Sequence, residues 1–272
     1  MLTATEFYSD RPLTPQEEAT FFTKLQLANG TFKTTVDHRM DDLNEVIVSR
    51  WQKTGFRPRE IMDVGVSSGI STAEWLDALS DSGFQVRMTA TDLALWANVV
   101  PLWPGAYALE NDGHVLRHIV FGMPIRPWRQ WVDYLTGYAF VSLLANGATR
   151  CRSHGNLKKV LLVSPRALRH NAIEWLEDDV FARNPAQLVQ RFDAIRAANI
   201  LNCGYFSADQ LRRAVANLKD RLAGPSARLI VNRTLQDGSN HATMFRLTDA
   251  NRFEAEMRLG QGSEIEDTVL CA

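Results

Sequence analysis

The chain has 272 residues and a mass of 30.6 kDa, which allows one large domain or two small ones. Hydrophobic residues make up 45% and charged residues 22%, a balance typical of globular proteins that excludes wholesale disorder. The 30 basic and 31 acidic residues leave a formal net charge of −1. Proteins that grip phosphate backbones usually carry a basic excess, so we expect no nucleic-acid partner.

The cysteines and the N-terminus favour a cytoplasmic protein. Cys151, Cys203 and Cys271 are few, odd in number and far apart, which is typical of a reducing compartment. No basic segment followed by an apolar run opens the chain, so we expect no signal peptide. The most apolar stretch, residues 135–145, is shorter than the roughly 20 residues of a membrane-spanning helix. The histidines show no metal-ligand spacing, so no metal is expected.

Residues 1–58 are predicted to form a helical segment that acts as a lid. Thr14 and Pro15, followed by acidic residues, are typical of a helix start. A second helix is predicted from about Asp41 to Gln52, before Gly55 ends it.

Residues 59–272 alternate between strand and helix patterns, and we expect them to form the cofactor-binding domain. A strand at 61–66, a glycine turn and a helix at 70–79 lead to a strand at 85–91. Further strands are predicted at 172–176, 192–197, 227–231, 241–247 and 253–259, with a helix at 209–222. This order predicts an α/β, Rossmann-like, doubly wound sheet of seven strands whose C-terminal strands are antiparallel.

Residues 93–160 interrupt that alternation after the second strand. Tryptophans and prolines gather here, among them Trp96, Trp103, Trp128 and Trp131. We predict an insert of loops and short helices that serves as the cap over an acceptor, with Arg126, Arg129 and Arg150 as candidate contacts for acidic groups. A homodimer surface and a peripheral membrane contact are the alternatives, because clustered aromatic and arginine side chains are typical of recognition surfaces.

The segment Asp63-Val64-Gly65-Val66-Ser67-Ser68-Gly69 joins the first strand to the first helix of this domain. Glycines at such a turn let a ligand approach the backbone, and the helix N-terminus leaves N–H groups for it. The segment lacks the GxGxxG pattern of nicotinamide-binding proteins. It therefore indicates a polar ligand other than NAD.

Acidic residues follow the next two strands. Asp92, followed by Leu93, closes the second strand, where a carboxylate can accept hydrogen bonds from a ribose diol. Asp178, Asp179 and Val180 follow the third strand, where an acid and the next N–H can serve an adenine ring. Acids at successive strand ends would repel a pyrophosphate and suit S-adenosylmethionine. The alternatives are a helix cap at Asp92 and a solvated turn at Asp178 and Asp179.

This pattern resembles the class I S-adenosylmethionine-dependent methyltransferases over roughly residues 60–272. Within them it is most similar to the chemotaxis-receptor glutamate methyltransferase branch. Residues 163–175 resemble that branch's V-x-P-x-L-R lead into the third strand, and 192–206 resemble its FDxIxxxNxLxYF motif, which includes Asn199. Residues 35–39 keep the Thr-to-Arg spacing of its TxFFR segment, with Asp37 and His38 in place of the paired aromatics.

The resemblance implies a binding site for S-adenosylmethionine, with S-adenosylhomocysteine as its product. Thr35 and Arg39 would contact the amino-acid end, and Asp92 the ribose. The adenine would lie near Asp179 and Val180. The full set expected to bind the cofactor is Thr35, Arg39, Asp63, Gly65, Ser67, Gly69, Asp92, Leu93, Asp178, Asp179, Val180 and Asn199.

The sequence therefore predicts transfer of a methyl group to a small-molecule or sugar-containing acceptor. The chemistry is an in-line displacement that depends mainly on positioning. His38 and Asp37 are the candidates for a general base, or else exposed polar residues at a helix start; Tyr205 is a candidate floor of the site, or else core. The alternatives are a protein carboxylate methyltransferase and a non-catalytic binding module on the same scaffold.

Overall fold

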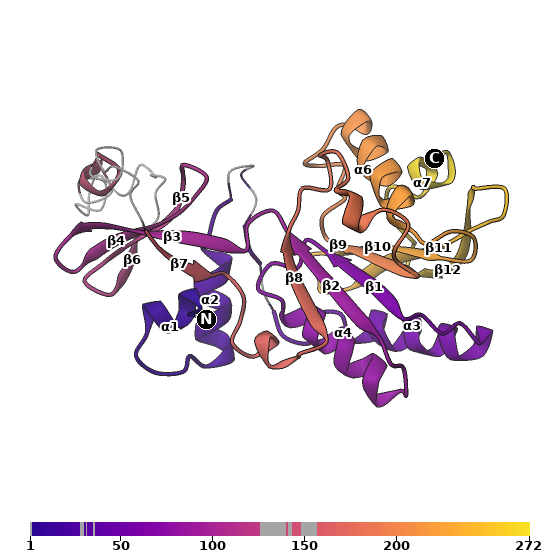
Figure 1. Ribbon diagram of the computed structural model, residues 1–272, viewed down its shortest axis with the longest axis horizontal. Coiled ribbons are helices and arrows are strands. Elements are labelled where there is room, and N and C mark those ends of the chain that lie inside the picture. The colour runs from indigo at the N-terminus through magenta and orange to yellow at the C-terminus, as the bar shows by residue number, and fades with distance from the viewer. Residues whose placement is uncertain are drawn as a thin grey trace. The chain divides into compact units, whose positions relative to one another are not determined.

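Five parallel and two antiparallel strands form one sheet in residues 37–93 and 168–272 (Figure 1). The spatial order is β12-β11-β10-β9-β1-β2-β8. The strands are β1 (Glu60–Val64), β2 (Arg87–Asp92), β8 (Ile173–Glu177), β9 (Ala194–Ala198), β10 (Arg228–Thr234), β11 (Asn240–Leu247) and β12 (Phe253–Leu259).

 β12 pairs antiparallel with β11, which pairs antiparallel with β10.

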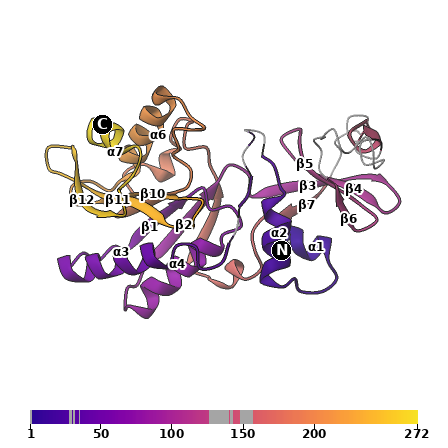
Figure 2. The same cartoon turned by 180° about the vertical axis from the view of Figure 1, so that it is seen from behind.

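Helices cover both faces of this sheet, as the two opposite views show (Figures 1 and 2). One face carries α3 (Asp41–Thr54) and α4 (Ile70–Asp81), and the other carries α6 (Ala208–Arg221) and α7 (Glu266–Leu270). The predicted fold class, a doubly wound seven-stranded sheet with antiparallel C-terminal strands, is therefore confirmed. An N-terminal helical segment and an insert after the second strand are present as well.

The structure describes residues 2–27, 30, 32–34, 36–125, 140, 143–147 and 157–272. The predictions on Thr35, Arg126, Trp128, Arg129, Trp131, Arg150 and Cys151 lie outside these residues. The chain divides into two compact units, Met1–Val36 with Ala94–Ala167, called unit 1, and Asp37–Leu93 with Leu168–Ala272, called unit 2. In the part of the chain that is described, no helix has the length and apolar character needed to cross a membrane.

Local signals explain where the helices of unit 2 begin and end. Ser207 caps α6, and its hydroxyl accepts from the Gln210 N–H while the Gln210 side chain returns to the Ser207 N–H. Gly55 ends α3 with φ +68°, a left-handed conformation that glycine adopts without a Cβ clash. These ends agree within two residues with the helices predicted from the sequence.

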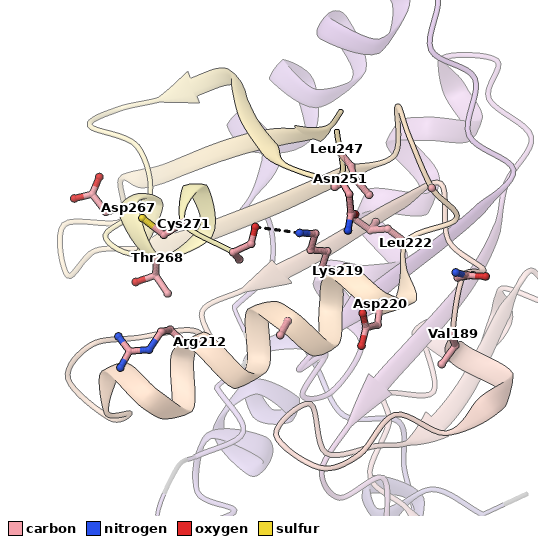
Figure 3. Close-up of a pocket in the computed structure, with 14 residues that line it drawn as sticks. Val189, Arg212, Lys219, Asp220, Leu222, Leu247, Asn251, Asp267, Thr268 and Cys271 are labelled. Carbon is pink, nitrogen blue, oxygen red and sulfur yellow. Dashed lines mark hydrogen bonds between the residues drawn. The ribbon is translucent and has the colours of Figure 1, made fainter. Parts of the chain in front are cut away.

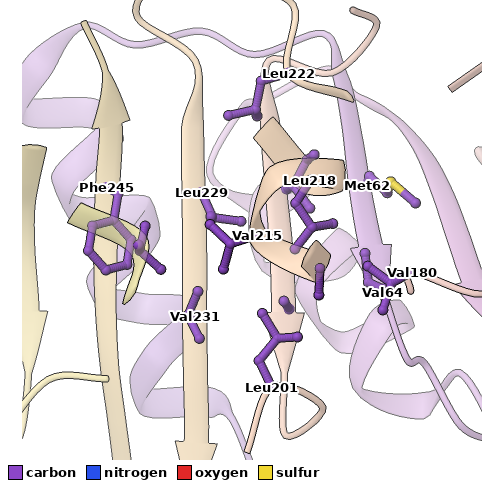
Figure 4. Packing of buried hydrophobic residues seen from close by; sticks show 14 of the residues in the cluster. Met62, Val64, Val180, Leu201, Val215, Leu218, Leu222, Leu229, Val231 and Phe245 are labelled. Atoms are coloured by element: carbon purple, nitrogen blue, oxygen red, sulfur yellow. The ribbon is translucent and has the colours of Figure 1, made fainter. Parts of the chain in front are cut away.

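A hydrophobic core cluster of unit 2 lies between α6 and the sheet (Figure 4). Leu211, Val215 and Leu218 recur at helical spacing and are each at most 2% exposed. They pack in one cluster with strand residues such as Leu229 and Val231. Burying each such side chain contributes roughly 1.5–3 kcal/mol, so this face fixes α6 on the strands that position the site.

Unit 1 contains a second sheet, so the prediction of loops and short helices for the insert is wrong. Its order is β6-β5-β4-β3-β7 and all its pairings are antiparallel. The strands are β3 (Trp96–Trp103), β4 (Ala106–Asn111), β5 (His114–Val120), β6 (Met123–Ile125) and β7 (Lys158–Leu161). The prolines misled the prediction: Pro101 lies where the β3–β4 register shifts, and Pro124 lies in the edge strand β6, two places that tolerate proline.

The first two helices pack on this second sheet. Thr14 caps α2 (Pro15–Thr23) through the capping box that the sequence indicates, and α1 (Ala4–Tyr8) precedes it. Phe22 is fully buried in a cluster with Val99 and Ile119. The predicted segment 1–58 is thus divided, since α1 and α2 belong to unit 1 whereas α3 belongs to unit 2.

Burial of His118 in β5 makes the stability of unit 1 depend on pH. The side chain is fully buried, and burial lowers its pKa to about 4 from the ordinary 6.5. Below about pH 6.5 the His118 imidazole of the unfolded chain is protonated. In the folded chain it stays neutral until about pH 4. The stabilisation is therefore complete above pH 6.5, and about 3 kcal/mol of it is lost as the pH falls to 4.

We predict that urea unfolding at pH 7 and pH 4.5 separates the wild type from His118→Gln. The wild type should lose roughly 2–3 kcal/mol more than the variant over this interval, because glutamine does not titrate. His241→Gln, at a partly exposed position, is the control and should behave as the wild type. Equal losses in the wild type and in His118→Gln would contradict the assignment.

Candidate functional site

The predicted site residues of unit 2 follow neighbouring parallel strands. Asp92 ends β2, Asp178 follows β8 and Asn199 follows β9, and β1 lies between β9 and β2. The carboxyl ends of parallel strands meet at one edge of a sheet, which is where doubly wound proteins bind ligands. The fold therefore brings these three residues to one edge, called here the carboxyl edge.

The glycine loop at residues 65–69 bonds to the end of β2. Gly65 has φ +74°, and a Cβ at this position would lie 2.0 Å from the Ile200 Cγ2 atom. The Gly65 and Val66 N–H groups both donate to the Thr91 carbonyl, at 2.7 and 3.1 Å. Gly69 has φ +82° at the N-cap of α4. Packing against Ile200 and the backbone conformation thus require glycine at position 65.

Asp92 is 6% exposed, and its Oδ2 accepts from the Ser67 N–H at 2.6 Å. This bond holds the glycine loop against the acid at the end of the second strand. Leu93, 40% exposed, leads toward the strand β3, so Asp92 caps no following helix and that alternative is wrong. A buried acid beside a glycine loop is an arrangement suited to a polar ligand.

The two acids after β8 have different environments. The Asp178 carboxylate is almost fully buried and pairs with Arg221 of α6 at 2.6 and 3.1 Å. Asp179 is exposed, and its Oδ1 accepts from the Phe181 N–H at 2.9 Å. Val180, the next residue, is buried in the core cluster. Of the two predicted acids, Asp179 is therefore the one whose carboxylate lies at the surface.

Asp63 lies beneath the site in a buried ion pair with Arg196 of β9. The Arg196 Nε and Nη2 atoms donate to the two Asp63 oxygens at 2.9 and 2.6 Å, and Thr72 adds a bond of 2.7 Å. Arg196 also donates to the Asn44 side chain and stacks over the Trp75 ring. The carboxylate of Asp63, a predicted cofactor residue, is thus bound to Arg196 and Thr72.

The turn at residues 37–40, before α3, also reaches the carboxyl edge. The Arg39 carbonyl accepts from Asn240 at 2.8 Å, and Asn240 begins β11 opposite Thr234, where β10 ends. Asn199 has φ +62° and exchanges bonds with the Thr234 N–H and hydroxyl. The turn is thereby fixed beside the end of β10.

His38 and Glu74 connect this turn to α4. The His38 N–H donates to Glu74 Oε1 at 2.8 Å, and the His38 Nδ1 atom lies 2.9 Å from Asp41 Oδ2. Asp41 raises the pKa of His38, which is an exposed side chain. Asp37 is partly buried next to it. His38 is therefore an exposed side chain whose ring is held by a carboxylate.

Arg39 and Glu74 are partly buried charged groups with incomplete hydrogen bonding. Burial and the nearby Arg196 lower the pKa of Arg39, whereas burial raises the pKa of Glu74. Within the described residues, the Arg39 Nε and Glu74 Oε2 atoms are buried and have no hydrogen-bond partner. The sequence analysis missed Glu74, and its only signal was an acid in the second turn of the helix after the glycine loop.

Tyr205 and Phe206 follow Asn199 and differ in exposure. Tyr205 is 70% exposed, so it is not part of the core. Phe206 packs against the core, and its ring lies 4.5 Å from that of Phe181. Of these two residues, Phe206 therefore packs on the core and Tyr205 does not.

A cavity of about 680 Å³ lies elsewhere in unit 2 (Figure 3). It is lined by residues that precede β9 and β10, including Gln190, Leu222 and Gly224, and therefore lies at the amino ends of these strands. Lys219 in its wall donates to the Ala272 carbonyl at 3.0 Å (Figure 3). None of the predicted site residues lines it.

The structure also bears on metal binding. Among the described residues, no three histidine, cysteine or acidic side chains lie together in an arrangement that could hold a metal ion.

The candidate site consists of the glycine loop with Asp92, Asp179, Asn199, Arg39 and Glu74.

No family model matches the chain, and no curated protein matches it in sequence. Among solved structures it is similar to the N-methyltransferase NodS from Bradyrhizobium japonicum WM9, with a TM-score of 0.38 and 14% identity over 80% of this chain and 71% of NodS. It is similar to CalS10, an amino pentose methyltransferase from Micromonospora echinaspora, with a TM-score of 0.36 and 13% identity over 76% of this chain and 63% of CalS10.

A third similar structure is the CMeT domain of the citrinin polyketide synthase, with a TM-score of 0.33 and 16% identity over 64% of this chain. The chain spans 28% of the length of that protein chain. One fold supports many functions, so function has to be argued from the site itself.

We predict that the buried pair beneath the site is required for stability. Arg196→Met leaves the Asp63 carboxylate buried without its cation, which should cost about 3–5 kcal/mol in urea unfolding. The double variant Asp63→Leu with Arg196→Met should recover a large part of the loss, because it removes both charges. Arg246→Met, in an exposed pair with Glu254, is the matched control and should cost at most about 1 kcal/mol. A cost below about 1 kcal/mol for Arg196→Met would show that the pair contributes little.

Proposed function

We propose that the protein is a methyltransferase that transfers a methyl group from S-adenosylmethionine to a small-molecule or sugar-containing acceptor. The observation that carries this proposal is the bond between Asp92 and the glycine loop at the carboxyl edge. It places a buried acid beside backbone donors, as recognition of a ribose requires. The Rossmann-like sheet and the resemblance to class I methyltransferases in sequence support the same conclusion.

The charged groups around this edge fit the chemistry of S-adenosylmethionine. This cofactor carries a ribose diol, an adenine amino group, a sulfonium and an amino-acid end. Asp92 suits the diol, exposed Asp179 suits the adenine amino group, and partly buried Arg39 suits the carboxylate. Acids at two successive strand ends would repel the diphosphate of NAD.

Each residue then has a role in positioning. S-adenosylmethionine, when bound, supplies a methyl group that is already activated on sulfur. Asp92 and Asp179 would orient the nucleoside, and the turn with Arg39 would hold the amino-acid end. Asp63 and Asp178 would act from below, since their carboxylates are committed to Arg196 and Arg221. Catalysis would come mainly from alignment and from exclusion of water.

His38 and Asp37 remain the proposed base for a hydroxyl acceptor. Asp41 engages the Nδ1 atom of His38, which leaves Nε2 as the nitrogen that would take the proton. The neutral form that a base requires is present only above the raised pKa of His38. Exposed Tyr205 would border the acceptor.

The choice of acceptor rests on the insert, which we propose binds it. Phe121, in the β5–β6 turn, and Met123, the first residue of β6, are 70% and 60% exposed and offer apolar contacts. The likeness of residues 192–206 to the chemotaxis-receptor branch is confined to sequence motifs, and we do not extend it to a protein acceptor.

Calorimetric titration with S-adenosylhomocysteine tests the proposal, with NAD as the control ligand. The wild type should bind the first and not the second. Asp92→Ala should weaken binding by roughly 1–3 kcal/mol because the diol loses its acceptor. Asp92→Asn keeps an oxygen for the Ser67 N–H. It therefore distinguishes loss of the contact to the diol from loss of the bond that holds the glycine loop.

Asp220→Asn, at an exposed position by the cavity of Figure 3, is the matched control and should keep full affinity. Folded wild-type protein that binds neither ligand would refute the methyltransferase proposal and favour a non-catalytic module. Unchanged affinity in both Asp92 variants would refute the ribose assignment.

A further inference from the structure

We propose that Arg57, Arg59 and Arg87, at the amino ends of β1 and β2, form a binding site for a small phosphorylated molecule. The inference does not rest on the proposed function, because this site lies at the opposite end of the strands from the carboxyl edge. It assigns a role to a group of arginines that the methyltransferase proposal does not use.

A cavity of about 570 Å³ lies where these two strands begin. Residues 57–59, which lead from α3 into β1, form one wall, and residues 83–87, which lead from α4 into β2, form the other. The volume is within the range of roughly 300–1,000 Å³ that is typical of sites for small molecules. A Cβ at Gly83 would meet no atom within 4 Å, so this part of the wall leaves room for a ligand.

The charged side chains of the lining are all basic. Arg57, Arg59 and Arg87 are exposed, and none of the described residues that line the cavity is acidic. In a chain with a formal net charge of −1, three cations around one cavity are a local excess. Guanidinium groups bind phosphate oxygens through paired N–H donors, so the lining is suited to a phosphate group.

Arg59 offers a guanidinium that is not used within the protein. Its backbone is fixed, because its N–H donates to Asp193 Oδ2 at 2.7 Å and its carbonyl accepts from the Arg87 N–H at 2.7 Å. The second bond also joins the two walls of the cavity. The Arg59 side chain makes no hydrogen bond or ion pair with another described residue. All of its N–H donors are therefore available to a ligand.

Arg57 and Arg87 are held in position and keep unused donors. The Arg57 guanidinium lies 5.0 Å from the centroid of the Phe84 ring, and its Nη1 atom donates to the Phe56 carbonyl at 3.2 Å. Arg87 pairs with Glu60 through its Nε atom at 2.9 Å. Its Nη1 and Nη2 atoms make no hydrogen bond to another described residue. Side chains that are already positioned lose less conformational entropy when a ligand binds.

The acids that contact these segments are engaged by other groups. Glu60 lies between Arg87 and Arg191, at 2.9 and 3.4 Å. The Oδ2 atom of Asp193 accepts two backbone N–H groups, at 2.7 and 3.0 Å. Neither acid forms an ion pair with the other two arginines of the lining, whose positive charge is therefore left for an anion.

The ends of two helices supply the alternative explanation for these arginines. α3 ends at Thr54 and α4 at Asp81, a few residues before the two walls of the cavity. The C-terminus of a helix attracts cations through its partial negative charge. Arginines that served only the helix ends would stabilise the fold without binding a ligand, so the test measures stability as well as binding.

Calorimetric titration of the full chain with inorganic pyrophosphate and with inorganic phosphate, at low ionic strength, tests the proposal. Arg59→Gln is the main variant, because the side chain it removes bonds to no other described residue. Arg59→Lys and Arg87→Gln accompany it. Arg212→Gln, which removes an exposed arginine of α6, is the matched control. The thermal unfolding midpoint of each variant shows whether it is folded.

The wild type should bind pyrophosphate more tightly than phosphate, because the second phosphate group reaches a second arginine. Its affinity should fall as the salt concentration rises. Arg59→Gln and Arg87→Gln should each weaken pyrophosphate binding by about tenfold to a hundredfold, since hydrogen bonds to a charged group are lost. Arg59→Lys should recover part of this loss. Arg212→Gln should stay within about twofold of the wild type.

Three results would overturn the proposal. The first is folded wild-type protein that binds no pyrophosphate at millimolar concentration; a lowered unfolding midpoint in Arg59→Gln and Arg87→Gln would then assign these arginines to the helix ends. The second is equal affinity for pyrophosphate in the wild type and in both variants. The third is a short single-stranded oligonucleotide that binds more tightly than pyrophosphate and is lost in Arg59→Gln, which would make this edge a nucleic-acid surface.

S-adenosylhomocysteine separates this inference from the proposed function. At saturating concentration it should leave the affinity for pyrophosphate unchanged, and Arg59→Gln should leave the affinity for S-adenosylhomocysteine unchanged. Failure to bind pyrophosphate therefore overturns the arginine site alone, whereas failure to bind S-adenosylhomocysteine overturns the proposed function alone.

Discussion

The buried ion pair between Asp63 and Arg196 is the interaction on which the candidate site depends. It joins β1 to β9 at the centre of the sheet and draws in α3 through Asn44 and α4 through Thr72 and Ser71. An unpaired charge at either position would be costly, because both side chains are almost fully buried. The pair therefore fixes α4, and with it the glycine loop that precedes it.

The same pair sets the electrostatics at the carboxyl edge. Arg196 is fully engaged, so its positive charge remains close to Arg39 without offering a donor to a ligand. A second buried pair, Asp178 with Arg221, fixes the loop after β8 in the same way. Acids in the predicted set thus divide into Asp63 and Asp178, which hold the structure, and Asp92 and Asp179, for which we propose a role in binding the nucleoside.

The sequence was sufficient for the sheet of unit 2 because periodicity and caps are local. Strand patterns such as 253–259 and the capped helix at 208–221 lie within two residues of their predicted places. It was insufficient for the insert, where proline and tryptophan suggested loops although Pro101 and Pro124 occupy a register shift and an edge strand. Glu74 and Arg196 were missed because their partners are distant in sequence. The sequence around Asp63 does not distinguish a carboxylate that faces a ligand from one that pairs with an arginine.

Hydrogen–deuterium exchange with and without saturating S-adenosylhomocysteine tests most directly where the ligand binds. Binding at the carboxyl edge predicts slower amide exchange in residues 65–70, 92–93, 178–181 and 37–41. The residues that line the cavity of Figure 3, such as 219–224 and 267–271, should exchange at an unchanged rate. Protection of the cavity residues, with the loops of the carboxyl edge unaffected, would contradict the site described above.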